Sequence, residues 1–158
     1  PDEDNDTQKP VLFWKVTDDN AYLSNWYLCS ITVGDVQFSS AEQALIYTKA
    51  ELAKATDAAN EILSTHDPAT IKEIGRNIEM SDSQLHYWEQ NRQGILENIL
   101  YLKFEQNPQL MELLLNTKSR TIAEASPRDD IYGIGMDRDE ALRTSPSTWK
   151  GQNILGDV

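Results

Sequence analysis

The sequence predicts an α+β fold: a single, mostly helical domain with a small β hairpin near its N-terminus. Two observations carry this prediction. Helix-start signals open several segments between residues 40 and 115, whereas runs of strand type occur only before residue 39. The length of 158 residues suits one domain with one core, since a chain of this size buries roughly 68 to 70% of the surface that its unfolded form exposes.

The expected β structure consists of one strand and one hairpin. Residues 11–15 (VLFWK) suit a short strand, and residues 31–33 and 36–38 flank the turn-forming pair Gly34-Asp35. Residues 1–10 are polar and acidic and lack hydrophobic side chains, so we expect a disordered tail there. The folded domain is therefore predicted over residues 11–158.

A strong capping signal opens the first helix. Ser39 with Glu42 and Ser40 with Gln43 both have the spacing of a capping box, in which a hydroxyl accepts from the backbone N–H three residues further on. Helix-forming residues then continue to about Lys54. Glu42 therefore lies in the first turn, where one reading makes it the capping acid.

Further helices are predicted by the same signals. Asp67-Pro68 is a good start for a short helix, and Gly75 stands where a C-cap glycine belongs. The other segments expected to be helical are residues 57–63, residues 83–104, a stretch that begins at residue 107, and residues 139–143. The remainder beyond Thr117 is rich in glycine and proline, which is typical of turns.

The composition excludes several classes of protein. A formal net charge of -12 argues against a broad basic face for nucleic acid, so any anionic ligand must be held locally. No apolar run is long enough to cross a bilayer, and no membrane partner is expected. Cys29 is the only cysteine, which fits a reducing compartment and predicts a cytoplasmic or nuclear location. His66 and His86 lack a cysteine cluster and read as surface residues, so no metal and no other cofactor is expected.

Arg92 interrupts an apolar face of the longest predicted helix. The apolar positions of this face are Trp88, Ile95, Ile99 and Leu102. Burial of a guanidinium without a partner is costly, so Arg92 must meet either an internal carboxylate, such as Glu124, or an anion of a ligand. The sequence leaves both alternatives open.

Glu42 and Lys49 lie two helical turns apart on one face, with roughly 10 Å between their Cα atoms. That gap is long for a salt bridge, but it suits two side chains that converge on a small ligand, one as acid or base and the other as cation or nucleophile. The simpler interpretation makes Glu42 the capping acid and Lys49 a solvated lysine like Lys54. On composition and spacing alone, the simpler interpretation is favoured.

Taken in order, the segments of this chain resemble the NADAR family, also known as YbiA-like proteins, from residue 13 to residue 156. The matching pieces are FW at 13–14, LSNW at 23–26, SSAEQ at 39–43 with Lys49 seven residues after its glutamate, GR at 75–76, Trp88 with Arg92, KFEQN at 103–107, LLLNT at 113–117, Glu124 with Ser126, Asp129 with YGIG at 132–135, and GQNILG at 151–156. Each piece alone is weak, whereas their order and spacing are specific.

The resemblance implies an α+β, mostly helical fold and cleavage of the N-glycosidic bond between ribose C1 and an exocyclic amine. One branch of the family removes ADP-ribose from the amino group of guanine in nucleic acid, and this is the activity we expect. The other branch hydrolyses phosphoribosylamino-pyrimidine intermediates of riboflavin synthesis. The expected partner is thus ADP-ribosylated guanine in nucleic acid or, alternatively, a phosphoribosylated small molecule.

On this resemblance we assign Lys49, Glu42 and Asp129 to catalysis. We hypothesise that Lys49 attacks ribose C1 to form a Schiff base while Glu42 or Asp129 moves protons; the fallback is direct hydrolysis with Lys49 as an electrostatic stabiliser. The residues assigned to substrate contacts are Asn25, Arg76, Trp88, Arg92, Lys103, Glu124, Tyr132, Gly133, Gly135 and Asn153.

Three departures from the family pattern concern the rim of the substrate site. Tyr132 stands where the family commonly has tryptophan, residues 137–149 look like an enlarged loop, and the chain stops at Val158 where relatives continue into a terminal helix. A rival hypothesis of another class is a non-catalytic module that holds ADP-ribose or NAD. Such a module needs cations but neither an acid nor a nucleophile, so the presence of Glu42 and Lys49 favours the enzyme.

Overall fold

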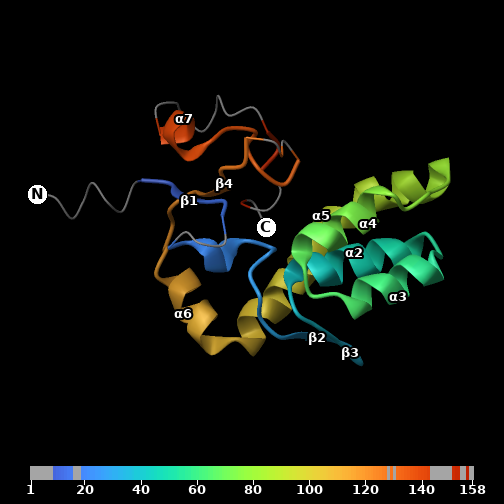
Figure 1. The fold of residues 1–158 in the computed structure, drawn as a ribbon. Coiled ribbons are helices and arrows are strands. Elements are labelled where there is room, and N and C mark those ends of the chain that lie inside the picture. Colours follow the sequence, from blue (N-terminus) through green and yellow to red (C-terminus); the bar gives the residue numbers. More distant parts are fainter. Residues whose placement is uncertain are drawn as a thin grey trace, which may run out of the picture. The chain divides into compact units, whose positions relative to one another are not determined.

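The computed structural model describes residues 9–15, 19–127, 129, 131–142, 151–153 and 156 (Figure 1). The elements in chain order are β1 (Val11–Phe13), the 3-10 helix η1 (Ala21–Leu23), β2 (Ile31–Val33), β3 (Val36–Phe38), α2 (Ala41–Leu52), α3 (Thr56–Ser64), α4 (Pro68–Arg76), α5 (Asp82–Gln106), α6 (Pro108–Leu115), β4 (Ile122–Glu124) and α7 (Arg138–Leu142). The predicted α+β, mostly helical class is confirmed. The chain divides into two compact units: unit 1 contains Pro1–Ser24 and Gln109–Val158, and unit 2 contains Asn25–Pro108.

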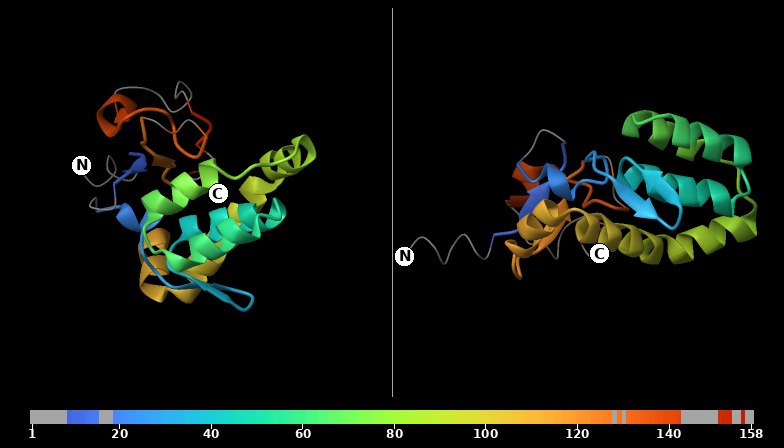
Figure 2. Two further views of the ribbon diagram at one scale, coloured as in Figure 1. Left: turned by 45° about the vertical axis from the view of Figure 1, so that its right-hand side comes forward. Right: turned by 90° about the horizontal axis from the view of Figure 1, so that it is seen from below.

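Unit 2 is built from the predicted hairpin and the helices α2 to α5. In the hairpin, β2 and β3 are antiparallel with Ile31 opposite Phe38, and Gly34 takes the positive φ of 59° that the tight turn requires. Helix α2 packs against α3, α4 and α5, and α5 also packs against β2 (Figure 2). Helix α2 is therefore the central element of this unit, and it carries Glu42 and Lys49.

One prediction about helix α4 is wrong. The helix begins as expected, with the Asp67 side chain accepting from the backbone N–H of Ala69 at 3.3 Å. It does not end at Gly75, because helical geometry continues through Arg76 and the C-cap residue is Asn77. Gly75 is buried inside the helix, so its lack of a side chain serves packing rather than termination.

Helix α5 also buries a slightly different face from the predicted one. Its capping box is formed by Ser81 and Gln84. Ile95 and Leu102 are only half-buried. The buried residues of the helix are Trp88, Leu96, Ile99, Leu100, Lys103 and Phe104. The inward face thus includes Lys103, a lysine near a helix end, where lysines are usually exposed.

Unit 1 contains a strand pairing that the sequence analysis misses. Strand β4 lies in the stretch predicted to be turn-rich, and it pairs in parallel with β1, with Val11 opposite Ile122. The backbone N–H of Val11 donates to Thr121 O at 2.7 Å, and that of Ala125 donates to Phe13 O at 2.8 Å. A three-residue strand has too little alternation to be recognised, and its partner is distant in sequence.

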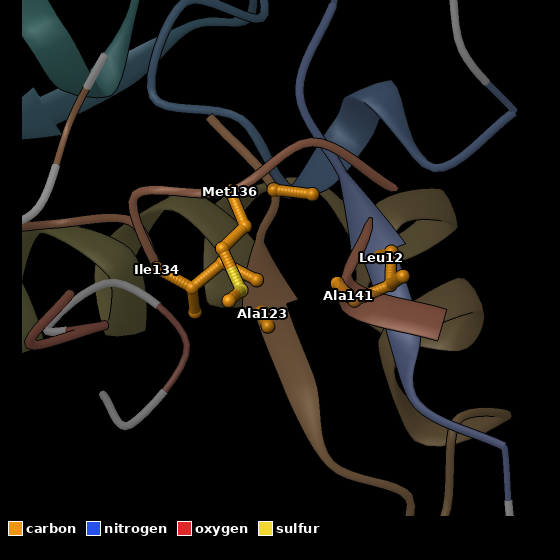
Figure 3. Packing of buried hydrophobic residues seen from close by; sticks show 6 residues of the cluster. Leu12, Ala123, Ile134, Met136 and Ala141 are labelled. Carbon is orange, nitrogen blue, oxygen red and sulfur yellow. The ribbon is translucent and has the colours of Figure 1, made fainter. Parts of the chain in front are cut away.

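The core of unit 1 forms around this pairing. Figure 3 shows the cluster, in which side chains from β1, β4, the segment after β4 and α7 meet. Its members are Leu12, Ala123, Ala125, Ile134, Met136 and Ala141. In the same unit, the Tyr22 hydroxyl donates to Leu113 O at 3.2 Å and so links η1 to α6.

Most of the predicted tail at residues 1–10 lies outside the described residues. Residues 143–149 of the predicted loop lie outside them as well. Within the described part of the chain, no helix is long and apolar enough to cross a membrane. The surface positions predicted for His66 and His86 are confirmed.

Candidate functional site

The start of α2 shows that Glu42 is not the capping residue. The Ser40 hydroxyl accepts from the backbone N–H of Gln43 at 3.1 Å, and Gln43 Oε1 accepts from the backbone N–H of Ser39 at 2.7 Å. The Gln43 amide also donates to Ile62 O and Thr65 O at 3.1 and 2.9 Å. Gln43 therefore ties the helix start to the end of α3. The interpretation of Glu42 as the capping acid is wrong.

Glu42 is a buried carboxylate, with only 8% of the residue exposed. Its backbone N–H donates to Asn25 O at 2.9 Å, which fixes the first turn of α2 against the segment before the hairpin. Carboxylates are rarely buried unless a partner or a function compensates the desolvation. The cap is formed by Ser40, and the Glu42 carboxylate acts electrostatically on Lys49.

Lys49 is half-buried and tied to α4 rather than solvated. Its Nζ donates to Gly75 O at 3.1 Å and lies 5.9 Å from the centre of the Trp88 ring. The interpretation of Lys49 as a solvated lysine like Lys54 is therefore wrong. The ammonium group of this α2 residue thus contacts α4 through Gly75 and α5 through Trp88.

The surroundings lower the pKa of Lys49 below the usual value for lysine. Burial of the ammonium group is the main cause, and the nearby Arg92 guanidinium adds to it. The Glu42 carboxylate acts in the opposite direction, since a negative charge favours the protonated amine. These effects place Arg92 and Glu42 within electrostatic reach of Lys49. A lysine with a lowered pKa supplies the neutral amine that nucleophilic attack requires.

Gly75 allows α4 to approach α2 closely enough for this contact. A Cβ atom at Gly75 would lie 2.8 Å from Ile46 Cγ2, which is closer than nonbonded carbons tolerate. The close approach brings Gly75 O to Lys49 Nζ. The glycine is thus part of the positioning of the lysine.

Gly75→Ala is expected to lower the free energy of unfolding by about 1–2 kcal/mol, because the clash with Ile46 outweighs the gain in helix propensity. Gly94→Ala in α5 is the matched control: a Cβ at Gly94 meets nothing within 4 Å. The control should raise stability by up to about 1 kcal/mol. Urea unfolding of both variants measures the difference, and equal effects at the two glycines would contradict this account.

The other residues assigned to the substrate in unit 2 occupy different environments. Trp88 is buried, with 5% exposed, and Arg92 is half-buried. Arg76 forms a 3.6 Å ion pair with Glu73, with about two thirds of each side chain exposed (66% and 64%). The structure thus brings Trp88 and Arg92 to Lys49, whereas Arg76 lies on the surface of α4. Their roles toward substrate stay predictions.

Lys103 is fully buried. Its Nζ lies 5.8 Å from the ring centre of Tyr27 and 5.3 Å from that of Phe104. Burial lowers the pKa of Lys103 to about 8, and the Cys29 thiol opposes this shift. Burial raises the pKa of the Cys29 thiol, and the Lys103 charge acts against this rise. With no exposed surface, Lys103 is a core residue here; its predicted substrate contact stays a prediction.

In unit 1, Asp129 organises the turn that carries the paired glycines. Its Oδ1 accepts from the backbone N–H groups of Ile131 and Tyr132, both at 3.0 Å, and its carbonyl accepts from that of Gly135 at 3.1 Å. This is the turn-forming role that aspartate often has. Its predicted catalytic role stays a prediction.

Both paired glycines are required by backbone geometry. Gly135 has a φ of 69°, a conformation that L side chains rarely adopt. A Cβ at Gly133 would lie 2.7 Å from Asp129 O and 2.8 Å from Glu124 O. Asn153 joins this turn to β4: its backbone N–H donates to Gly133 O at 2.9 Å, and its side chain bonds both Glu124 N and Ile122 O at 3.2 Å. The structure thus gathers Glu124, Asp129, Gly133 and Asn153 in unit 1.

The site in unit 2 has the parts of an acid–base and nucleophile pair: a buried carboxylate, a desolvated lysine, a second cation and an aromatic face. Within the described ranges, no group of three or more His, Cys, Asp or Glu residues could hold a metal ion. Of the two capping pairs that the sequence predicts, Ser40 with Gln43 is the one that forms. The packing role of Gly75 has no local signal in the sequence.

Comparison with known proteins gives a consistent family. The model of the NADAR domain matches residues 12–158. The solution structure of the E. coli protein YbiA has a TM-score of 0.75 and 23% identity, over 95% of this chain and 80% of that chain. This likeness supports the fold.

Three curated relatives are similar in sequence. Protein irg-1 of Caenorhabditis elegans is 34% identical over 78% of this chain and 58% of its own length. N-glycosidase R617 of Acanthamoeba polyphaga mimivirus is 35% identical over 77% of this chain and 71% of its own. The riboflavin biosynthesis protein VVA0006 of Vibrio vulnificus is 29% identical over 82% of this chain and 34% of its own. The chain thus spans well under two thirds of the first and third of these proteins.

Proposed function

Because the chain belongs to the NADAR domain family, we propose that it is an N-glycosidase that cleaves the bond between ribose C1 and an exocyclic amine. The relative named N-glycosidase R617 supports an enzyme of the glycosidase kind. The observation that carries the proposal is Lys49, a half-buried amine with a lowered pKa and a buried carboxylate within electrostatic reach.

In the proposed mechanism, the neutral amine of Lys49 attacks C1 of the ribose. The bond between C1 and the ring oxygen breaks, and this oxygen takes a proton that the attacking amine loses, so the ring opens. The C1–N bond to the exocyclic amine then breaks, and that amine takes a proton as it leaves. The resulting imine between Lys49 and C1 is then hydrolysed by water, which releases the free sugar and restores the lysine. The net reaction consumes one water and yields a ribose and an amine.

Glu42 is the proposed proton carrier on this face. It gives a proton to the departing amine and accepts one from the attacking water, a cycle for which a buried carboxylate is suited. Asp129 is the second carboxylate proposed for this role. The alternative mechanism is direct hydrolysis, in which a carboxylate activates water and Lys49 only stabilises charge.

Glu42→Gln should reduce kcat by roughly 10²- to 10⁴-fold, which is the usual contribution of general acid–base catalysis. Thermal stability should change little, since the helix is capped by Ser40 with support from Gln43 and the substitution keeps the size of the side chain. Gln43→Leu is the contrasting variant and should lower stability instead. Full turnover by Glu42→Gln would remove Glu42 from the mechanism.

ADP-ribose attached to the amino group of guanine in nucleic acid is the proposed substrate. Arg92 supplies local positive charge for its phosphates on a chain whose net charge is -12, and one modified nucleotide can be held through its ADP-ribose. A phosphoribosylamino-pyrimidine of riboflavin synthesis is the second candidate. It is favoured by the similarity to the Vibrio vulnificus riboflavin biosynthesis protein.

One experiment separates these substrates and the non-catalytic alternative. The chain is incubated separately with a guanine-ADP-ribosylated oligonucleotide and with the pyrimidine intermediate, and release of ADP-ribose or ribose 5-phosphate is measured. Release from the oligonucleotide supports the proposed substrate, and release from the pyrimidine alone supports the second candidate. Binding of ADP-ribose without release from either would favour a non-catalytic ADP-ribose-binding module and overturn the proposal.

A further inference from the structure

Asn25 carries a buried side-chain oxygen without a hydrogen-bond partner. Only 6% of the residue is exposed, and among the described residues no donor reaches its Oδ1. Buried polar atoms in folded proteins are nearly always paired, because an unmade hydrogen bond leaves the cost of desolvation uncompensated. For this oxygen to be hydrogen-bonded, the donor must therefore come from outside the described residues.

The position of Asn25 connects this oxygen to the proposed reaction site. Asn25 O accepts from the backbone N–H of Glu42 at 2.9 Å, so Asn25 is hydrogen-bonded to the residue that is proposed to move protons. Its backbone is thus fixed at the first turn of α2. The same contact leaves the side-chain oxygen as the atom of Asn25 that still needs a partner.

The chemistry of an amide oxygen restricts what it can bind. It is an acceptor only, so it pairs with a hydroxyl or an N–H group and not with an ionised phosphate oxygen. The Arg92 guanidinium near Lys49 suits the phosphate. In a ribosyl amine, the donors near the reacting carbon are the exocyclic N–H, whose bond to C1 is broken in the reaction, and the ribose hydroxyls, which stay with the sugar. Hydrogen bonds to the hydroxyl beside the reacting carbon strengthen in glycosidase transition states.

We infer that Asn25 is a specificity-determining residue whose Oδ1 accepts a hydrogen bond from a ribose hydroxyl, at C2 or C3. The inference rests on the proposed function, because it takes the substrate to be a ribosyl amine. Since the oxygen is fully covered, the contact requires the side chain to turn about its own single bonds. Asn25 then distinguishes ribosyl substrates from deoxyribosyl ones.

Stability provides the first test. Asn25→Leu replaces the amide by an apolar group of similar shape and removes an unpaired buried acceptor, so its Tm should equal or exceed that of the wild type. Gln43→Leu makes the same change of amide to alkyl at a buried position whose amide is fully bonded. Its Tm should fall by several degrees, roughly 4 °C or more. A loss of Tm in Asn25→Leu as large as in Gln43→Leu would show that the Asn25 amide has partners within the fold, and would overturn the inference.

Binding provides the second test, with ribose 5-phosphate, 2-deoxyribose 5-phosphate and 3-deoxyribose 5-phosphate as probes in calorimetry. The wild type should bind ribose 5-phosphate about tenfold more tightly than one of the deoxy sugars, which identifies the hydroxyl. Asn25→Leu should bind ribose 5-phosphate and that deoxy sugar equally. Equal discrimination by wild type and variant, or no discrimination by the wild type, would overturn the inference.

These outcomes are separate from the fate of the proposed function. If the chain releases no amine from either ribosyl substrate but distinguishes ribose from a deoxy sugar through Asn25, the N-glycosidase proposal is refuted and the role of Asn25 in binding ribose stands. If the wild type releases amine and Asn25→Leu distinguishes the sugars as the wild type does, the N-glycosidase proposal stands and the role of Asn25 is refuted.

Discussion

Lys49→Met is expected to lower kcat/KM by roughly 10⁴-fold, because it removes the amine that attacks ribose C1 in the proposed mechanism. The variant should still fold, since a methionine side chain of similar length can occupy the half-buried position beside Trp88. The measurement is steady-state release of the amine product, alongside thermal unfolding of the same preparation.

Lys49→Arg distinguishes the two roles considered for this residue. Arginine keeps a positive charge but provides no neutral amine near physiological pH. If Lys49 forms a Schiff base, Lys49→Arg should be as inactive as Lys49→Met. If Lys49 only stabilises charge, the arginine variant should retain much more activity than the methionine variant, and the covalent mechanism would be wrong.

The pH dependence of the wild type provides a further check on Lys49. Activity should rise with pH as the lysine loses its proton, with a midpoint below the usual lysine pKa because burial and Arg92 lower the pKa of Lys49. Arg92→Met removes one of these causes and should shift the midpoint to higher pH. Glu42 raises the pKa of Lys49, so the residual activity of Glu42→Gln should have a lower midpoint.

The second large effect is expected on stability, at Lys103. Burial holds the pKa of Lys103 at about 8, against the usual lysine value of 10.5, so the folded chain binds its proton more weakly than the unfolded chain does. Near pH 7 the ammonium form is therefore destabilising. Lys103→Met fills the same volume without charge and should raise the free energy of unfolding at pH 7 by about 1–3 kcal/mol.

The sign of the accompanying pH effect follows from the same shift. Between the folded pKa of about 8 and the usual lysine pKa of 10.5, the unfolded state holds more protons, so stability rises with pH in this window. From pH 7 to 9 the gain from this group is about 1 kcal/mol. Lys103→Met should lack that gain. Urea unfolding at the two pH values measures it, and a variant that is less stable than the wild type with an unchanged pH slope would contradict this account.

Local signals in the sequence were enough to predict most of the fold. The Ser40 and Asp67 helix starts and the Gly34 turn depend on residues a few positions apart, and these helices and the hairpin appear where the signals place them. The parallel pairing of β1 with β4 depends instead on contacts distant in sequence, and β4 was missed. Gly75 shows a related limit: its position near a helix end predicted a C-cap, whereas packing against Ile46 determines its role.

The candidate site was predictable only in part, for similar reasons. Spacing placed Glu42 and Lys49 on one face, but it could not distinguish a buried pair from a capping acid and a solvated lysine. That distinction depends on Ser40 and Gln43, which form the helix start without Glu42, and on Gly75 O, which accepts a hydrogen bond from Lys49. The full burial of Lys103 could not be predicted either, because a lysine near a helix end is usually exposed.

Chemical trapping at Lys49 tests the central claim most directly. The wild-type chain is incubated with ADP-ribosylated guanine oligonucleotide in the presence of borohydride, which reduces an imine to a stable amine, and the digested peptides are analysed by mass spectrometry. We predict a sugar adduct on the peptide that contains Lys49, and no adduct in Lys49→Arg. An active chain that releases ADP-ribose but carries no adduct at Lys49 would contradict the covalent mechanism.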